Sequence, residues 1–387
     1  MSFLNCSYDS ANFEYTLIYE ERGFIFKSLF RLSFPDDFLY RPVQVYDGFL
    51  FAVVSKSMRS GEDLYTDLPI SAWGLRQANL LIEAWNNLNP SEYAKIQIFA
   101  SKVCEDLIVS EKNEAISAFS GGVDACFTLV RHNENDWNNA SYNIKNVLCV
   151  HGFDIKADAY NEYEKLMTRV SPILDYYECK RLNVWTNITE TLEQDWEMTH
   201  SAQLACCLHL FSEHFTTALL GSSDPYNEFD IRWGSNPAID FLFSSDRMKL
   251  VHDGAGFTRT QKVHRISTNP EILKSLKVCW INSAGDNCGI CEKCYRTRLN
   301  FLASDIINPS CFNGNIKLSR LLYLKIDNKS SISELKSILN YAKKRKMKHS
   351  WVSVLNIVIL KSIIWVNLNL FRKKIKNAIK KPFIKKI

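Results

Sequence analysis

The chain has 387 residues, of which 46% are hydrophobic and 23% are charged; this composition is ordinary for a soluble globular protein and excludes a fibrous or largely disordered one. The length leaves room for a large core and for two domains. The net charge of +5 is unevenly distributed, because residues 343–387 contain 14 Lys and Arg and no Asp or Glu, which leaves the other residues at −9. The sequence therefore predicts an acidic body with a strongly basic tail.

Residues 1–110 predict an α+β extension ahead of the main domain. Aromatic and branched residues alternate over 13–19, 24–30 and 48–54, which indicates a small antiparallel sheet. Residues 70–107 carry apolar side chains at helical spacing and are expected to be helical. Residues 1–20 lack the apolar segment of a signal peptide, so we expect a reducing, cytoplasmic location.

From residue 115 the pattern becomes an alternation of strands and helices. Strands are predicted over 115–119, 146–150, 181–185 and 216–220, and helices over 125–132, 157–170 and 195–214. Such alternation predicts an α/β fold with a doubly wound parallel sheet, which we assign to a domain over residues 111–312.

The first of these strands ends in a glycine turn that suits a phosphate group. Its residues are Ser120, Gly121, Gly122, Val123 and Asp124. Two adjacent glycines allow successive backbone N–H groups to face one point, and the N-terminus of the next helix adds positive potential. No Gly-Lys-Ser/Thr follows, so this is not a lysine-bearing Walker loop. The alternative is an ordinary turn that begins a helix.

Polar residues follow two other strands at the same predicted edge of the sheet. His151 and Asp154 follow the second strand, and Gly221 and Ser222 follow the fourth. We predict that all four help to bind a nucleotide in a crevice there, and each also fits a plain loop. The loop-rich, basic residues 230–267 are predicted either to cover this crevice or to form a solvated surface.

Four cysteines have the spacing of a metal site. Cys279 is followed by Cys288, Cys291 and Cys294. Zn²⁺ takes four such thiolates tetrahedrally, whereas an iron–sulfur cluster is an alternative with similar ligands. We predict a structural zinc segment over 279–294, because four thiolates leave no open position for water.

Together the two motifs resemble those of a known enzyme superfamily. Ser120-Gly121-Gly122-Val123-Asp124 at a strand-to-helix turn resembles the PP-loop of the ATP pyrophosphatases, which split ATP into AMP and pyrophosphate. The cysteine segment, with Arg296 and Arg298 behind it, resembles that of 7-cyano-7-deazaguanine synthase, a PP-loop enzyme that adenylates a carboxylate and converts it, with ammonia, to a nitrile. The resemblance covers about residues 115–302.

This resemblance implies an ATP-dependent adenylating enzyme that forms a C–N bond by activating a carboxylate or carbonyl, most simply the carboxylate of a small molecule or macromolecule, for nitrogen transfer. The loop amides and Ser120 would hold the phosphates, Asp124 would orient the loop or bind Mg²⁺, and the protein could be a homodimer. The chain departs from the pattern at Ala125, where the family has Ser or Thr, which removes one phosphate contact. A PP-loop sulfur transferase or tRNA-modifying enzyme, with Cys126 as its thiol, and a non-catalytic nucleotide-binding protein are the alternatives.

Residues 313–387 predict a helical, basic tail. The stretch 351–371 is mostly apolar but contains Lys361, which suits a membrane-crossing helix poorly. Basic clusters at 343–346 and 372–374 flank it. The pattern favours peripheral contact with the inner face of a membrane through 343–387 over a nucleic-acid arm, and a helix packed on the body is the third alternative.

Overall fold

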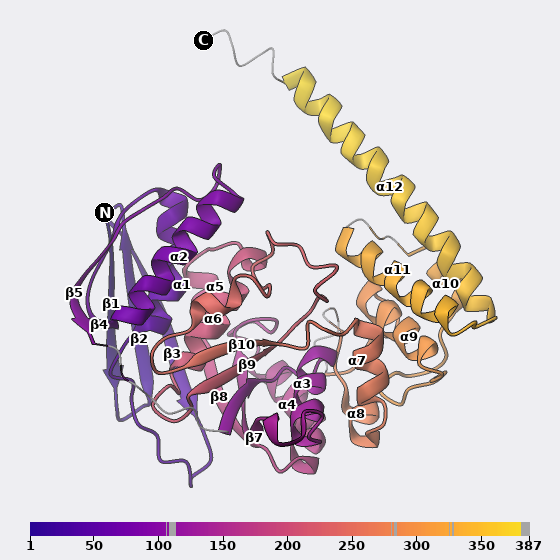
Figure 1. Cartoon of the computed structure of the whole chain (residues 1–387), viewed down its shortest axis with the longest axis horizontal. Helices are drawn as coiled ribbons and strands as arrows, with labels where there is room; N and C mark the ends of the chain where they lie inside the picture. Colours follow the sequence, from indigo (N-terminus) through magenta and orange to yellow (C-terminus); the bar gives the residue numbers. More distant parts are fainter. Residues whose placement is uncertain are drawn as a thin grey trace.

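In the described part of the chain, ten strands form one sheet, with helices packed on both of its faces (Figure 1). The computed structural model describes residues 1–105, 107, 114–279, 281, 285–324, 326 and 329–380. The strands are β1 (Ser2–Asp9), β2 (Glu14–Glu21), β3 (Phe24–Ser33), β4 (Leu64–Ser71), β5 (Ile98–Cys104), β6 (Glu114–Ala118), β7 (Asn143–His151), β8 (Lys180–Thr186), β9 (Thr217–Gly221) and β10 (Lys249–Asp253).

The helices are α1 (Asp47–Ser60), α2 (Ala72–Leu88), α3 (Val123–Asn133), α4 (Tyr160–Tyr176), α5 (Ile188–Thr191), α6 (Trp196–His209), α7 (Arg259–Ile266), α8 (Pro270–Ser275), α9 (Glu292–Ala303), α10 (Leu318–Leu321), α11 (Lys329–Lys344) and α12 (Ser350–Lys380), with short 3₁₀ turns η1 (Asn138–Ala140) and η2 (Asp240–Phe243).

The sheet is mostly parallel, and its strand order is β10-β9-β6-β7-β8-β3-β2-β1-β4-β5. From β6 the order runs to β7 and β8 on one side and to β9 and β10 on the other, all in parallel pairs. The N-terminal strands join this arrangement directly, because β3 pairs antiparallel with β8. The order therefore reverses between β6 and β9, which is where sheets of this class bind ligands, at the carboxyl ends of the strands.

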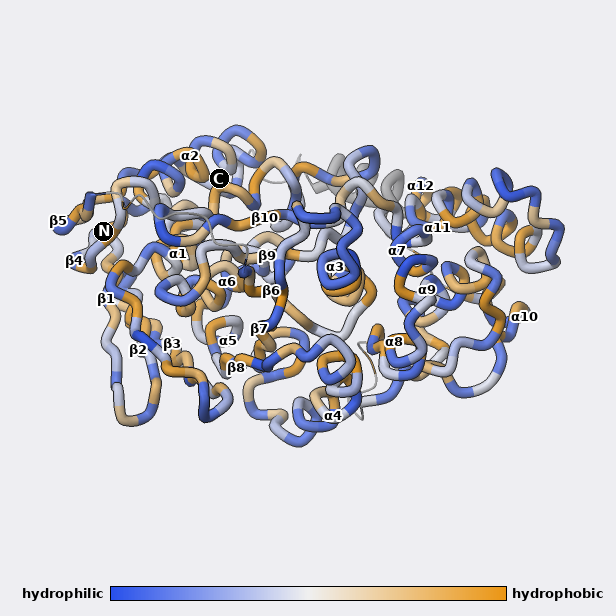
Figure 2. Tube along the Cα trace, turned by 60° about the horizontal axis from the view of Figure 1, so that its bottom comes forward, coloured by the Kyte–Doolittle hydropathy of each residue, from blue (hydrophilic) through white to orange (hydrophobic). Residues whose placement is uncertain are grey.

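Three groups of buried side chains hold the elements together. The first lies between one face of the sheet and α1, α2 and α6, and the second lies between the other face and α3, α4, α7 and α8. Successive side chains of β6 point to opposite faces of the sheet, so Ile116 belongs to the first group and Ala115 to the second. The third lies among the four helices α9, α10, α11 and α12, and these helices lie beside the sheet in both views (Figures 1 and 2).

The α/β pattern predicted from residue 115 onward is confirmed, since β6 to β9 and α3, α4 and α6 lie where strands and helices were expected. The N-terminal prediction is partly wrong. Residues 48–54 are not a strand but part of α1, and residues 70–107 contain the end of β4, all of α2 and all of β5 rather than helix alone. Within α1 the run 49–54 is buried on every side, so its apolar residues show no helical period.

Some predicted features lie outside the described residues, namely the domain boundary near residue 110 and the end of the tail at 381–387. Within the described chain, one helical stretch is long and apolar enough to cross a membrane. It is Ser350–Leu368 of α12, and 33% of its apolar window is buried inside the protein.

Candidate functional site

The glycine turn predicted to bind phosphate joins β6 to α3. Gly121 has a φ of +70°, and a Cβ there would collide with Val170, so the position requires glycine. Helix α3 begins at Val123, and among the described residues no side chain caps its N-terminus. Its first N–H groups therefore remain available at the turn, which is an arrangement that attracts an anion.

Asp124 is the centre of a charge cluster that is largely shielded from solvent. Its carboxylate accepts hydrogen bonds from Arg259 at 2.7 Å and from Lys262 at 3.3 Å, both on α7. Burial works to raise the pKa of Asp124, but the two cations outweigh burial and hold the pKa below its ordinary value. Lys262 is itself fully buried and also donates to the carbonyl of Ser222, so it joins the turn after β6 to the turn after β9.

Gly221 and Ser222 are thus brought close to Asp124, where they form part of the turn after β9. A Cβ on Gly221 would lie 2.9 Å from the backbone of Asp124, so β9 needs glycine there to approach α3. The Ser222 hydroxyl donates to the Asp224 carbonyl at 2.6 Å, and the Ser222 N–H donates to the Asp253 carbonyl at 2.7 Å. Both residues therefore shape the turn beside the predicted phosphate site.

His151 is turned toward its own loop. Its Nε2 forms a hydrogen bond with the Lys156 carbonyl at 2.8 Å, and its ring stacks on Tyr163 with centroids 4.5 Å apart. Burial lowers the pKa of His151, so the ring is neutral at physiological pH. The geometry gives this residue a structural role that its place at a strand end did not reveal.

Asp154 and Lys293 bring the cysteine segment into the same neighbourhood. Burial, followed by the charge of Arg259, lowers the pKa of Lys293 to about 8, while Asp154 and Asp124 act in the opposite direction. Charges that act on one another in this way lie close together. In the sequence Lys293 lies between two of the predicted metal ligands, in the first turn of α9, and α9 packs against α7, so the cysteine segment borders the charge cluster.

Two acidic residues that were not assigned to the site from the sequence also border this cluster. Asp224 follows β9, and its pKa is raised to about 6 by burial and then by the charges of Glu334 and Asp124. Glu334, on α11, lies 3.7 Å from Arg259 and also contacts Arg296. With Ser223, Glu228 and Ser333 among their neighbours, they line a cavity of about 20 Å³. No local pattern marks Glu334, which lies in the predicted tail.

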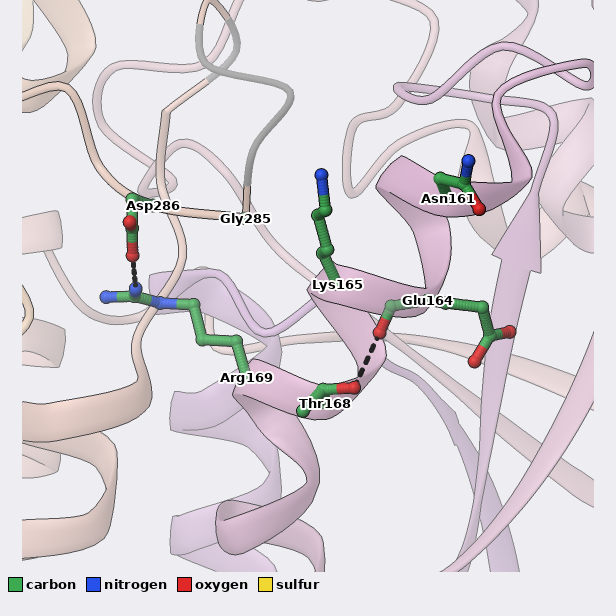
Figure 3. Close-up of a pocket in the computed structure, with 7 residues that line it drawn as sticks. All are labelled: Asn161, Glu164, Lys165, Thr168, Arg169, Gly285 and Asp286. Carbon is green, nitrogen blue, oxygen red and sulfur yellow. Dashed lines mark hydrogen bonds and ion pairs between the residues drawn. The ribbon is translucent and has the colours of Figure 1, made fainter.

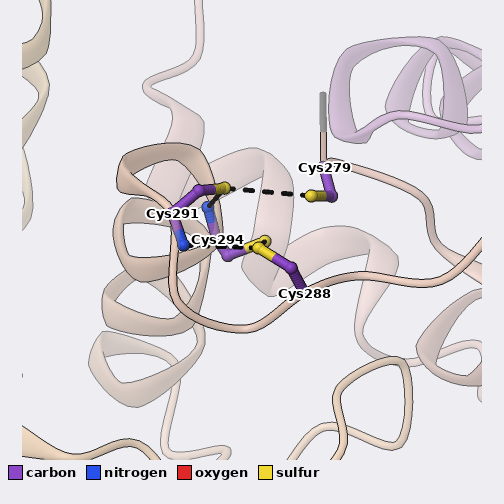
Figure 4. Close-up of side chains that lie close together, drawn as sticks. All are labelled: Cys279, Cys288, Cys291 and Cys294. Carbon is purple, nitrogen blue, oxygen red and sulfur yellow. Dashed lines mark hydrogen bonds between the residues drawn. The ribbon is translucent and has the colours of Figure 1, made fainter. Parts of the chain in front are cut away.

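The four predicted metal ligands converge in space (Figure 4). Their sulfur atoms all lie within 4.8 Å of one another, with 3.9 Å between Cys279 and Cys291 and 3.8 Å between Cys288 and Cys294. Zn–S bonds of about 2.3 Å in a tetrahedron require S–S distances of roughly 3.8 Å. The set therefore fits a metal such as zinc, and the separations are far too long for disulfides.

The N–H groups of Cys291 and Cys294 also donate to sulfur. They point at the sulfur atoms of Cys288 and Cys291, at 3.4 and 3.5 Å. Hydrogen bonding with Cys294 lowers the pKa of Cys291 to about 5, and the same bond raises the pKa of Cys294. Such N–H···S contacts stabilise thiolates, which is the form that binds a metal.

Asn287 and Arg169 hold the cysteine segment in place. The Asn287 side chain accepts from the N–H groups of Val278 and Cys279 and donates to the carbonyls of Leu276 and Cys311, all at 2.8–3.1 Å. Arg169, on α4, reaches Asp286 at 2.7 Å across a shallow cavity of about 560 Å³ (Figure 3). Its guanidinium also donates to the carbonyls of Ser275, Leu276 and Cys311.

The cysteine segment is bonded directly to the glycine turn. The backbone N–H of Lys277 donates to the carbonyl of Gly121 at 2.9 Å, two residues before the first cysteine. The Lys277 ammonium donates to the carbonyl of Asp286 at 2.8 Å. The two motifs, which lie far apart in the sequence, therefore form one structural unit.

Residues 230–267 contain β10, which the sequence analysis missed, and a buried Asp–His pair. Asp240 accepts from Ser201 and Ser235 at 2.8 Å and from the Nδ1 of His252 at 2.7 Å. The Nε2 of His252 is buried and has no hydrogen-bond partner among the described residues. This leaves one ring nitrogen of the pair available to a ligand.

A row of rings lies next to this pair. Phe153, Trp196, His200 and Trp233 have successive centroid distances of 5.0, 5.8 and 5.7 Å. Burial lowers the pKa of His200, and the charge of Asp240 acts against this. The rings come from the loop after β7, the start of α6 and the loop after β9, so they stand at the carboxyl edge of the sheet.

Cys126, the thiol considered for sulfur transfer, is completely buried, and burial raises its pKa far above the ordinary value. A buried, protonated thiol is a poor nucleophile. Ala125 is also buried.

No protein-family model, curated protein or solved structure matches this chain.

Proposed function

We propose that this protein is an ATP-dependent adenylating enzyme that activates a carboxylate for C–N bond formation. The observation that carries the proposal is the glycine turn between β6 and α3, at the point where the strand order of the sheet reverses, with the buried Lys262 and the half-buried Arg259 paired to its Asp124. The reversal is that of a doubly wound sheet, and such sheets bind nucleotides at this edge.

In the proposed reaction a carboxylate oxygen attacks the α-phosphorus of ATP. The bond between this phosphorus and the oxygen bridging to the β-phosphate breaks, and pyrophosphate leaves. Ammonia then attacks the acyl carbon, AMP departs, and the nitrogen loses a proton. The N–H groups at the start of α3 would hold the pyrophosphate, and Arg259 and Lys262 would balance its growing charge.

Both oxygens of Asp124 are already paired with cations, so its role is to fix Arg259 and Lys262 beside the turn. Asp224, which lines the cavity together with Arg259 and Glu334, would be the oxygen donor for Mg²⁺. Magnesium would supply charge neutralisation at the phosphates. The four cysteines fit zinc in a structural role, since they fill its coordination sphere.

The row of rings supports a substrate with a planar group. Flat apolar faces offer stacking area, and the buried Nε2 of His252 offers one polar contact next to them. The carboxylate to be activated would then extend from this planar group toward the glycine turn.

The test is product analysis of ATP cleavage with ammonium present, together with ATP–pyrophosphate exchange over a set of planar carboxylic acids. We expect AMP and pyrophosphate, and exchange only with a matching acid. Release of ADP and phosphate would contradict the proposal. ATP binding without cleavage across the set would favour a non-catalytic nucleotide-binding protein.

Asp124→Asn should lower the rate at least 100-fold with the fold retained, because it releases Arg259 and Lys262 from their fixed positions. Lys274→Met, which removes an exposed cation on α8, is the matched control and should leave the rate unchanged.

A further inference from the structure

The outer face of α12 carries a row of exposed apolar side chains. Ile357, Leu360, Ile364 and Leu368 follow one another at helical spacing and are 49–60% exposed, and Trp365 beside them is 44% exposed. Large side chains gathered on one helix face in this way mark an interaction surface rather than the scattered exposure that is normal for soluble proteins. We call these five residues the α12 stripe.

The opposite face of the same helix is fixed to the protein. Trp351, Leu355, Val358, Ile359 and Val366 are buried in the core group that joins α9 to α12. In addition, the Lys361 ammonium donates to the Leu322 carbonyl at 2.8 Å. A helix that crossed a bilayer would have to expose all its faces to lipid and give up these contacts, so α12 is built to lie on a surface rather than to span it.

The positive charge of the tail indicates what kind of surface the α12 stripe contacts. From Lys343 onward the sequence carries 14 cations and no anion, and α12 runs away from the body toward its C-terminal end (Figure 1). A second copy of the chain docked on the stripe would bring two such tails together, and they would repel each other. A nucleic acid would use the cations but leave the aliphatic stripe in water.

We propose that the α12 stripe is a docking surface for an anionic lipid bilayer. The apolar side chains enter the boundary between headgroups and acyl chains, while the basic residues that flank the stripe in the sequence contact lipid phosphates and carboxylates. The enzyme would then work as a peripheral protein on an acidic membrane face. This inference is independent of the reaction proposed above, because it requires neither ATP nor the glycine turn.

Co-sedimentation of the full chain with vesicles tests the proposal. We expect binding to vesicles of 70% phosphatidylcholine and 30% phosphatidylserine, and little binding to pure phosphatidylcholine. The bound fraction should fall as salt rises but not reach zero, since the apolar contribution is not screened. Absence of binding to the anionic vesicles at low salt would overturn the proposal.

Substitutions on the helix separate the contributions. Ile364→Ser with Leu368→Ser should weaken vesicle binding roughly tenfold or more, because two apolar side chains no longer leave water. Asn356→Ser with Asn367→Ser changes exposed polar positions of the same helix and should have no effect. Equal circular dichroism spectra and zinc contents would show that each variant is folded.

Two other outcomes would assign the surface differently and overturn the lipid proposal. Preferential binding to single-stranded RNA, lost in salt and unchanged by the two stripe substitutions, would mark a nucleic-acid arm. A dimer in lipid-free buffer that these substitutions dissociate would mark an interface between copies. A blue shift of tryptophan fluorescence on vesicle binding that disappears in Trp365→Phe would place the stripe itself in the bilayer.

Discussion

Replacing Asn287 with alanine should strongly destabilise the protein, because the Asn287 side chain forms hydrogen bonds with four backbone groups. It satisfies two N–H groups and two carbonyls around the cysteine segment and is only 5% exposed. A net contribution of about 0.5–1.5 kcal/mol for each bond predicts a loss of roughly 2–6 kcal/mol. Urea unfolding with zinc present measures it.

Asn86→Ala is the matched control, because the Asn86 side chain donates one hydrogen bond, to the Tyr93 carbonyl at 2.8 Å, and its loss should cost about 1 kcal/mol. Asn287→Asp should be at least as destabilising as Asn287→Ala, since it keeps the acceptor for Val278 and Cys279 but turns a buried carboxylate oxygen toward the carbonyls of Leu276 and Cys311. If Asn287→Ala were no more destabilising than Asn86→Ala, the amide would not be holding the segment, and the reasoning would be wrong.

Three further predictions concern the metal, the sheet and pH. Cys291→Ser should lower the zinc content from one per chain to near zero, as measured by elemental analysis. It should also weaken ATP binding, as measured by calorimetry, because the chain next to the metal ligands is hydrogen-bonded to Gly121. An unchanged ATP affinity would contradict this coupling. Gly221→Ala should lower ATP affinity at least tenfold, because its Cβ would displace the start of α3; an unaltered titration would count against this close approach. Burial lowers the pKa of His209 to about 4 from an ordinary 6.5, so the unfolded chain takes up the proton first as pH falls. The free energy of unfolding should therefore fall by up to about 3 kcal/mol between pH 6.5 and 4. In urea unfolding at several pH values, His209→Gln should reduce this dependence of stability on pH.

The features that could be predicted from the sequence are those encoded in neighbouring residues. The glycine turn and the cysteine spacing each occupy a few consecutive positions, so their geometry follows from the chain itself. The alternation of strands and helices from residue 115 is equally local, and the structure confirms it.

The features that could not be predicted depend on distant contacts. Nothing near Asp124 shows that Arg259 and Lys262 will pair with it, and nothing near Glu334 shows that a tail residue will border the same cluster. His151 has the position of a ligand-binding residue, but its partner is decided by how its own loop folds back. Helix α1 was misassigned because complete burial removes the periodicity that distinguishes a helix from a strand.

The antiparallel pairing of β3 with β8 has a consequence for synthesis of the chain on the ribosome. Ser33 and Asn183, which meet in this pair, are 150 residues apart, so β3 leaves the ribosome roughly 8–30 s before its partner at about 5–20 residues per second. During that interval the hairpin of β2 and β3 presents a bare strand edge to other chains. Exposed Phe24 and Ile25 at its tip add to the hazard. The nascent protein therefore passes through a period in which this strand edge is open to aggregation with other chains.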